Sequence, residues 1–206
     1  MSEAREQILA RIRGALGDGP AEPGPLPTYR LAGTAAPQER VERFAERVAD
    51  YRARVELTED PVAAAEGALA GRRVVVAPDL PAELRPAGLE LIEDTRLAAS
   101  ELDALDAVLT TCAAACADTG TIALDGGAGQ GRRAITLVPD THVCIVRADQ
   151  IVETVPELLT ALGPAARAGC PIVLVSGPSA TSDIELERVE GVHGPRTLVV
   201  LIQTSP

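Results

Sequence analysis

Hydroxyl and carboxylate side chains are concentrated in one segment, Ser176-Gly-Pro-Ser-Ala-Thr-Ser-Asp-Ile-Glu185. It follows an apolar run at 172–175 that is typical of a strand, and ligands in open α/β sheets gather beyond the carboxyl ends of strands. Its hydroxyls and backbone N–H groups could bind an anion, with Asp183 and Glu185 as acceptors or a general base. The same residue types also cap helices, so a helix start is the alternative.

A turn at residues 117–121, Ala-Asp-Thr-Gly-Thr, could contribute to the same site. Gly120 permits close approach of the backbone, and the hydroxyls of Thr119 and Thr121 flank it. These groups could contact a ligand. A simple turn without a ligand is the alternative.

His193 stands in a second turn, Gly191-Val-His-Gly194-Pro195. A histidine between glycines is expected on exposed, tightly turned backbone, so His193 is a better candidate for chemistry than His142. An incidental histidine is the alternative. The two histidines lack metal-ligand spacing, and adding Asp183 does not supply it, so no metal site is predicted.

Arg132 and Arg133 follow a glycine-rich run at 126–131. Such a segment could close over a carboxylate or phosphate held by an arginine fork. The glycines are expected between two strands with no helix start behind them, so they do not match a dinucleotide-binding fingerprint. A hairpin tip is an equal alternative.

Composition excludes several kinds of chemistry. All 19 basic residues are arginine, which excludes lysine Schiff bases and a P-loop lysine. With 30 acidic residues the net charge is −11, and the three aromatic residues all lie within 29–51. An acidic chain without aromatic residues beyond position 51 is not expected to bind nucleic acid.

The four cysteines, at positions 112, 116, 144 and 170, stand mostly among small apolar residues. Cys112 and Cys116 are separated by three residues rather than the two of zinc knuckles and ferredoxin clusters. We therefore expect reduced cysteines that act as small buried hydrophobic residues, with no iron–sulfur cluster on this chain.

The amino-terminal region is predicted to be an appendage, residues 1–36, ahead of an α/β domain at 37–206. It holds an amphipathic helix at 2–16 and then a stretch too rich in proline and glycine for a helix or central strand. The apolar stripe of that helix must pack on the domain or on another chain, so a homo-oligomer formed through it is one expectation. The sequence shows no secretory signal and no membrane span, and a cytoplasmic location is expected.

The remaining pattern predicts an α/β domain with a mixed, largely parallel sheet flanked by helices. Helices are expected from Pro37, over 61–70 after Asp60, and over 155–162 after the Thr154-x-x-Glu157 capping box. Strands are expected at 55–57, 74–77, 89–92, 107–111, 121–124, 134–138, 143–146, 172–175 and 198–202. The three strands between 121 and 146 suggest an antiparallel insertion.

The chain resembles the lactate-utilisation protein C branch of the LUD-domain family. The resemblance covers roughly residues 37–206, and its specificity lies in the order and spacing of four segments: 117–121, 132–142, 176–185 and 191–195. At positions 180 and 182, where the family pattern has a basic residue and Ala, this chain has Ala180 and Ser182. One charge expected for anion binding is therefore missing.

The resemblance implies a fold related to ribose-5-phosphate isomerase and the CoA transferases. It also implies a place in a bacterial system that oxidises L-lactate to pyruvate, with the iron–sulfur clusters on partner subunits and no cofactor on this chain. The family motifs carry over, without assigned roles, to Thr119, Gly120, Ser176, Gly177, Ser179, Thr181, Asp183, Glu185 and His193.

Three functions are compatible with the sequence. The first is a component of a lactate-oxidising system that binds a small carboxylate or other anion through residues 176–185, Gly120 and His193. The second is an assembly subunit that offers binding surface to iron–sulfur partners. The third, by analogy of fold alone, is a stand-alone enzyme on phosphorylated or CoA-linked substrates, for which Glu185 is the one nominated carboxylate.

Overall fold

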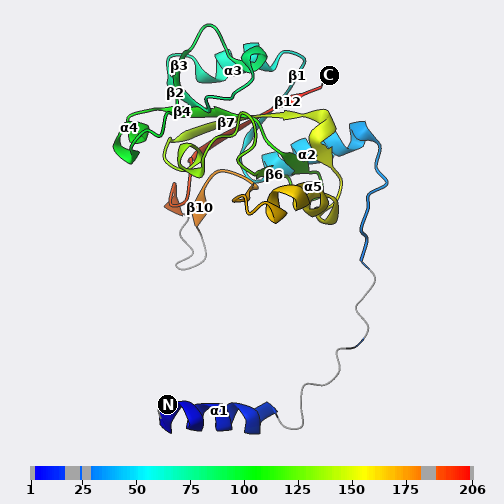
Figure 1. Cartoon of the computed structure of the whole chain (residues 1–206). Coiled ribbons are helices and arrows are strands. Elements are labelled where there is room, and N and C mark those ends of the chain that lie inside the picture. Colours follow the sequence, from blue (N-terminus) through cyan, green and yellow to red (C-terminus); the bar gives the residue numbers. More distant parts are fainter. Residues whose placement is uncertain (1–2, 17–23, 25–28, 182–188, 205–206) are drawn as a thin grey trace. The chain divides into compact units, whose positions relative to one another are not determined.

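The structure, a computed structural model, describes residues 3–16, 24, 29–181 and 189–204 (Figure 1). The chain forms two units, Met1–Arg30 and Leu31–Pro206. The first unit holds helix α1 (Glu3–Leu16), which confirms the predicted amphipathic helix and has no buried residue. No helix among the described residues is long and apolar enough to span a bilayer.

The second unit contains the remaining elements. Its helices and 3₁₀ turns are α2 (Pro37–Asp50), α3 (Pro61–Leu69), η1 (Ala82–Leu84), α4 (Ala99–Asp103), η2 (Arg133–Thr136), η3 (Ala148–Gln150) and α5 (Val155–Arg167). Its strands are β1 (Arg54–Thr58), β2 (Arg73–Val76), β3 (Glu90–Glu93), β4 (Ala107–Thr110), β5 (Ala114–Cys116), β6 (Thr121–Leu124), β7 (Thr141–Arg147), β8 (Ile151–Val152), β9 (Val173–Val175), β10 (Ala180–Thr181), β11 (Val189–Glu190) and β12 (Thr197–Gln203).

A six-stranded parallel sheet in the order β1-β12-β7-β4-β2-β3 forms the centre of this unit. β12 lies between β1 and β7 and pairs with both, Val199 facing Arg54 on one side and Val143 on the other. The predicted α/β architecture with a largely parallel sheet is confirmed. Figure 1 shows this sheet as the middle layer, with α3 on one side and α2 on the other.

A smaller sheet in the order β8-β5-β6-β9 packs beside the first. β6 is antiparallel to both β5 and β9, whereas β5 and β8 are parallel. The predicted antiparallel insertion at 121–146 is therefore wrong in its membership: β6 is antiparallel, but β7 is a central strand of the parallel sheet. β5 was not predicted, because its Ala-Ala-Cys sequence has neither a clear period nor β-branched residues.

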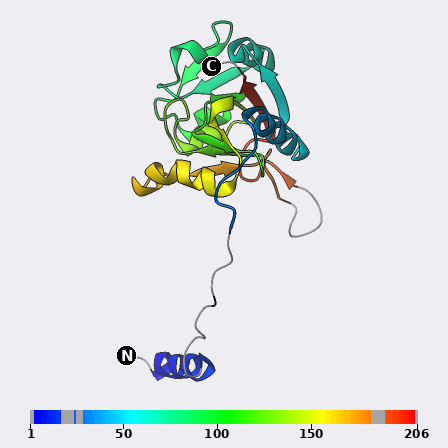
Figure 2. The same ribbon diagram turned by 90° about the vertical axis from the view of Figure 1, so that its right-hand side faces the viewer.

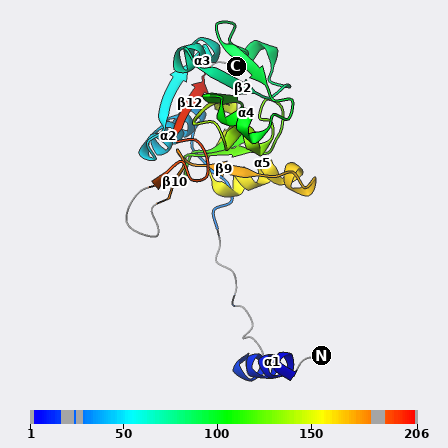
Figure 3. The same ribbon diagram turned by 90° about the vertical axis from the view of Figure 1, so that its left-hand side faces the viewer.

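The two faces of the central strands bury different side chains. Val143, Ile145, Val199 and Leu201 face α3, and the alternate residues Cys144, Val146, Val200 and Ile202 face α2 and the small sheet. Strands that are apolar on both faces are expected when both faces are covered. A further cluster packs α5 against β5 and β6, so α5 covers the outer side of the small sheet (Figures 2 and 3).

Residues 134–138, predicted as a strand, instead begin in the 3₁₀ turn η2 and then follow an irregular path. The turn closes on itself, since Thr136 Oγ1 donates to Arg133 O at 3.1 Å. Ile135 is fully buried in a separate cluster with Leu102 and Val108. The apolar residues of this segment therefore pack over the sheet without joining it. Periodicity alone does not distinguish such a buried turn from a strand.

The predicted helix starts are confirmed by their caps. Asp60 Oδ1 accepts hydrogen bonds from the N–H groups of Val62 and Ala63, at 3.1 and 2.9 Å. At α5, Thr154 Oγ1 accepts from Glu157 N at 3.4 Å, and Glu157 Oε2 accepts from Thr154 N at 2.8 Å. α5 runs on to Arg167, beyond the predicted end at 162.

Two carboxylates hold the segment that precedes α2. Glu153, 2% exposed, accepts from Ala35 N at 2.6 Å, and Glu157 accepts from Gly33 N at 3.1 Å. Hydrogen bonds from the N–H groups of Thr154 and Gly33 lower the pKa of Glu157. Residues 31–36, assigned from sequence to the appendage, thus contact the α/β unit.

Gly120 lets the turn between β5 and β6 approach the backbone of α2. Its φ is +59°, and an added Cβ would lie 2.7 Å from the carbonyl carbon of Arg47 and from the nitrogen of Val48. No side chain fits without moving one of the two segments.

An ion pair anchors the segment after the glycine-rich loop. Arg132 donates to both carboxylate oxygens of Asp94, at 2.6 and 2.9 Å, and also to Leu97 O. The Asp94 side chain is only 4% exposed. The hydrogen bond from Arg132 lowers the pKa of Asp94.

We predict that Gly120→Ala destabilises the protein more than Gly71→Ala. Gly71 also has positive φ, +73°, but has nothing within 4 Å of an added Cβ. Gly71→Ala should therefore cost only the conformational penalty, roughly 1–2 kcal/mol. Gly120→Ala should add about 1–3 kcal/mol of steric strain. Urea unfolding measures both, and equal losses would contradict the close packing on α2.

We also predict that Asp94→Asn lowers the free energy of unfolding by about 1–3 kcal/mol at neutral pH. Because the folded pKa of Asp94 is depressed, its contribution is complete above its unfolded pKa of about 3.9 and is lost as pH falls through the folded value. The difference in the free energy of unfolding between wild type and variant should become smaller below about pH 4. Unfolding curves at several pH values measure it.

Asp140→Asn is the matched control for this pair. Asp140 pairs with Arg196 at 2.5 Å, but both side chains are at least half exposed. Its replacement should cost at most about 1 kcal/mol. If Asp94→Asn lowers the free energy of unfolding by the same amount from pH 7 to pH 3, the stabilisation does not come from the ionised Asp94 carboxylate and the prediction is wrong.

Candidate functional site

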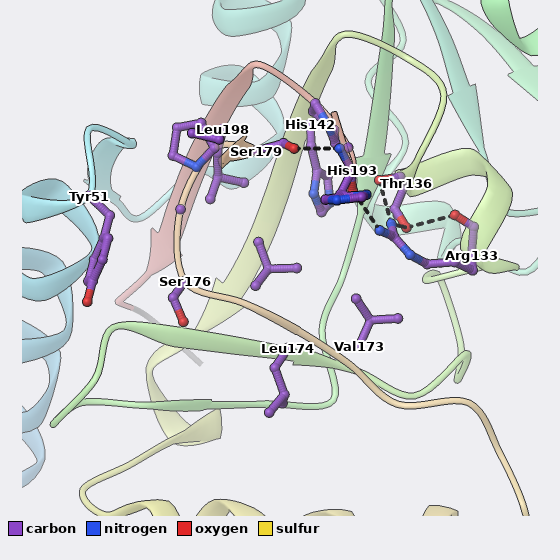
Figure 4. A pocket seen from close by; sticks show the side chains of 16 residues that line it. Tyr51, Arg133, Thr136, His142, Val173, Leu174, Ser176, Ser179, His193 and Leu198 are labelled. Carbon is purple, nitrogen blue, oxygen red and sulfur yellow. Dashed lines mark hydrogen bonds between the residues drawn. The ribbon is translucent and has the colours of Figure 1, made fainter. Parts of the chain in front are cut away.

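A cleft of about 330 Å³ lies where the segment after β9 meets the turn before β12 (Figure 4). Its polar lining includes Arg133, His142, Ser176, Ser179 and His193. Four of these were predicted site residues, so the structure brings together positions more than 40 residues apart in the sequence. Gly177 and Gly194, also predicted, complete the same walls.

The cleft lies at the amino ends of β7 and β12, marked by His142 and Leu198. The sequence predicted a site at the carboxyl edge of the sheet. The segment at 176–180 does follow the carboxyl end of a strand, but that strand, β9, is an edge strand of the small, partly antiparallel sheet. Its direction relative to the parallel sheet could not be known from the apolar run alone.

Hydrogen bonds through Ser179 and Arg133 fix the two walls to each other. Ser179 Oγ accepts from His193 N at 2.9 Å, and Ser179 N donates to Pro195 O at 2.8 Å. Arg133 donates to His193 O at 3.0 Å and to Thr136 O at 2.8 Å. Figure 4 shows the guanidinium between Thr136 and His193.

Arg133 is the main electrostatic feature of the cleft. Its guanidinium donates to two backbone carbonyls and to Thr136 Oγ1, at 3.0 Å, and pairs with no carboxylate among the described residues. Burial lowers the pKa of Arg133, although an arginine stays charged at neutral pH. A partly buried cation that is compensated only by dipoles favours a negatively charged ligand.

A chain of three hydroxyls leads into the cleft from the turn at 117–121. The Thr119 and Thr121 Oγ1 atoms are 2.7 Å apart, and Thr121 Oγ1 is 2.8 Å from Ser176 Oγ. Ser176 lines the cleft, whereas Thr119 lines a separate hollow with Arg47 and Asp118. The hydroxyl of Thr121 therefore orients Ser176. Gly120 does not line the cleft and packs against α2.

Tyr51 and Thr136 line the cleft but were not predicted. Tyr51, which follows α2, packs against the loop so closely that a Cβ on Gly177 would lie 2.7 Å from the Tyr51 Cβ. Thr136 lies in the turn mistaken for a strand. No local pattern marks either residue, because both enter the site through long-range packing.

His142 belongs to β7 and is 2% exposed, rather than preceding the strand as predicted. Its Nε2 atom lies 2.8 Å from Thr110 Oγ1 on the neighbouring strand β4. The ring lines the cleft beside His193 (Figure 4). His142 is a buried, hydrogen-bonded histidine, while His193 is exposed.

Arg132, another predicted residue, does not line this cleft. Arg132 is committed to Asp94, and its side chain lies on a different hollow, shared with Cys170. Thr181 pairs through its backbone with Val189 in the β10–β11 hairpin. Asp183 and Glu185 lie outside the described residues.

The cysteines follow the predicted pattern with one exception. Cys112, Cys116 and Cys144 are buried, and Cys170 is exposed. A hydrogen bond with Cys144 and burial raise the pKa of Cys112, so its thiol stays protonated. In the described part of the chain, no group of three or more His, Cys, Asp or Glu residues is placed to hold a metal.

Comparison with solved structures finds a crystal structure of a DUF162 family protein from Deinococcus radiodurans. The two chains superpose with a TM-score of 0.72 and 38% sequence identity, over 82% of this chain and 99% of that one. This similarity, over most of both chains, shows that the two proteins share the α/β fold.

Sequence comparison finds one relative that aligns over nearly the whole chain and others that align over less than half of it. Lactate utilization protein C of D. radiodurans is 44% identical over 205 residues, which are 98% of this chain and 96% of that protein. Uncharacterized protein YkgG of Escherichia coli is 40% identical over 90 residues, and lactate utilization protein C of Halalkalibacterium halodurans is 36% identical over 84. Those two alignments cover 38% and 36% of the relatives.

Residues 84–202 match the LUD domain family. The matched range contains every lining residue of the cleft except Tyr51. Together with the relative that aligns over nearly the whole chain, this match establishes that the chain belongs to the LUD-domain family.

Proposed function

We propose that this protein serves in lactate utilisation by binding a small carboxylate in the cleft between Ser176 and His193. The observation that carries the proposal is the Arg133 guanidinium, which lines the cleft and has no carboxylate partner among the described residues. The D. radiodurans relative is named for lactate utilisation, and this supports lactate or its product as the ligand. We place this activity in the cytoplasm.

The polar groups around the cleft suit a 2-hydroxy or 2-oxo carboxylate. The carboxylate would accept hydrogen bonds from Arg133, whose planar fork matches two oxygens. The hydroxyl or keto oxygen would face Ser176 or His193, which can both donate and accept. The apolar side chains of Val173 and Leu198 line the same cleft and would contact the hydrocarbon end.

Oxidation of such a ligand requires an electron acceptor. We propose that iron–sulfur subunits of the same system supply it, and that this chain binds and presents the carboxylate to them. The resemblance of the sequence supports this division of labour. An assembly role without a ligand and a stand-alone enzyme that uses Glu185 remain hypotheses, and no described residue favours either.

We predict that Arg133→Met weakens lactate and pyruvate binding by roughly 10- to 100-fold, because hydrogen bonds to a charged group contribute about 1.5–3 kcal/mol. Isothermal titration calorimetry measures the affinity. Lactamide, the uncharged analogue, should bind wild type more weakly than lactate does. That preference should disappear in the variant.

Arg196→Met is the matched control, because Arg196 lies in the neighbouring turn and pairs with Asp140. It should leave lactate binding unchanged. Circular dichroism and the urea midpoint of Arg133→Met check that the cleft variant is folded, and Ser176→Ala provides a milder change in the opposite wall. If wild type binds neither lactate nor pyruvate, or Arg133→Met binds both as wild type does, the proposal is wrong.

A further inference from the structure

A second cleft, of about 660 Å³, lies at the opposite, carboxyl edge of the parallel sheet. Its lining includes Cys112 after β4, Arg147 at the end of β7 and Gln203 at the end of β12. From β2 the chain continues outward to β3, whereas from β4 it continues toward β7. This reversal between neighbouring strands is the place where open α/β sheets bind ligands.

The glycine-rich loop between β6 and η2 forms a fixed wall of this cleft. Thr111 N donates to Gly129 O at 3.1 Å, and Thr111 Oγ1 donates to Ala128 O at 2.7 Å. Gly129 N donates to Asp79 Oδ1 at 3.1 Å. The loop is thus tied to the segments that follow both β2 and β4, so the cleft is formed before any ligand arrives.

Gln130 in this loop is a buried polar side chain with an unused donor. It is 4% exposed, lines the cleft, and accepts from Asp125 N through Oε1 at 2.7 Å. Because a backbone N–H can only donate, this bond fixes which side-chain atom is the oxygen. The Nε2 group donates to no acceptor in the described residues, and it is open to solvent rather than sealed in the core, because Arg40 Nε is the one buried side-chain polar atom there without a partner.

The charges of the lining exclude a simple anion as the best ligand. Glu83 and Asp125 contribute two carboxylates. Among the described residues of the lining, Arg147 is the only basic side chain, and Asp149 already pairs with it at 2.9 and 3.3 Å. This balance is opposite to that of the cleft at Arg133, so the two clefts should select different ligands.

The lining also excludes a flat aromatic ligand held by stacking, because all aromatic residues of the chain lie within 29–51. What it offers is a carboxamide donor at Gln130 and carboxylate acceptors, since the Gln150 carboxamide is already bonded to Cys112 O and Arg147 N. Hydroxyl groups both donate and accept, so adjacent hydroxyls can satisfy both kinds of partner. We infer that this cleft binds an uncharged, polyhydroxylated small molecule.

The inference is tested by saturation-transfer NMR titration of the full chain with glycerol, erythritol and xylitol. We expect saturable binding that strengthens along the series as more hydroxyls find partners. Gln130→Glu keeps the acceptor for Asp125 N but replaces the free donor with an oxygen. Asp125→Asn likewise keeps an oxygen for Gly127 N, which now donates to Oδ1 at 2.9 Å. Each should weaken xylitol binding by about three- to tenfold.

Controls separate this inference from the proposed function. Arg133→Met and Ser176→Ala should leave xylitol binding unchanged, and lactate should not compete with xylitol. Hydrogen exchange should slow at residues 125–131 with xylitol and remain unchanged at 176–180. Absence of saturable binding, equal binding by Gln130→Glu, or protection only at 176–180 would overturn the inference whatever the outcome for lactate.

Discussion

The apolar layer between the two sheets is the constraint on which the rest of the molecule depends. Cys144, Val146, Val200 and Ile202 from the parallel sheet meet Ile122 and Leu124 from the small sheet, and Phe44 of α2 joins them. This layer fixes the small sheet against one face of the parallel sheet. Without it, the segment after β9 would have no reason to lie near Arg133 and His193, which come from separate parts of the chain.

How much could be predicted depended on the range of the interactions involved. Asp60 and Thr154 predict the starts of their helices correctly, because a helix cap involves only residues within three positions of each other. Apolar runs such as 198–202 predict buried strands correctly, because a strand whose two faces are both covered is apolar at nearly every position. Residues 134–138 look like a strand, yet Ile135 fills a gap over the sheet, and that gap is created by distant residues.

Part of the lining of the site was predictable, but the place of the site in the fold was not. Ser176, Ser179, Arg133 and His193 were selected by residue type and motif, and they do line one cleft. The edge of the sheet at which they meet depends on the direction of β9, which only sheet pairing determines. The glycine-rich loop illustrates the converse. Its own sequence suggested a flap over an anion, but Arg132 pairs with Asp94 and only Arg133 of the two arginines lines the cleft at His193. Gln130 of the same loop lines the opposite cleft.

The position of β12 has a consequence for how the chain folds. Thr204 contacts Thr58 across a sequence separation of 146 residues, and among the described strands β12 alone joins β1 to β7. Such non-local closure makes folding slow, since loop entropy is lost before the contacts form. During synthesis, β1 and β7 remain unpaired edges until β12 leaves the ribosome. Because an unpaired strand edge can pair with another chain, these two strands are open to aggregation during that interval.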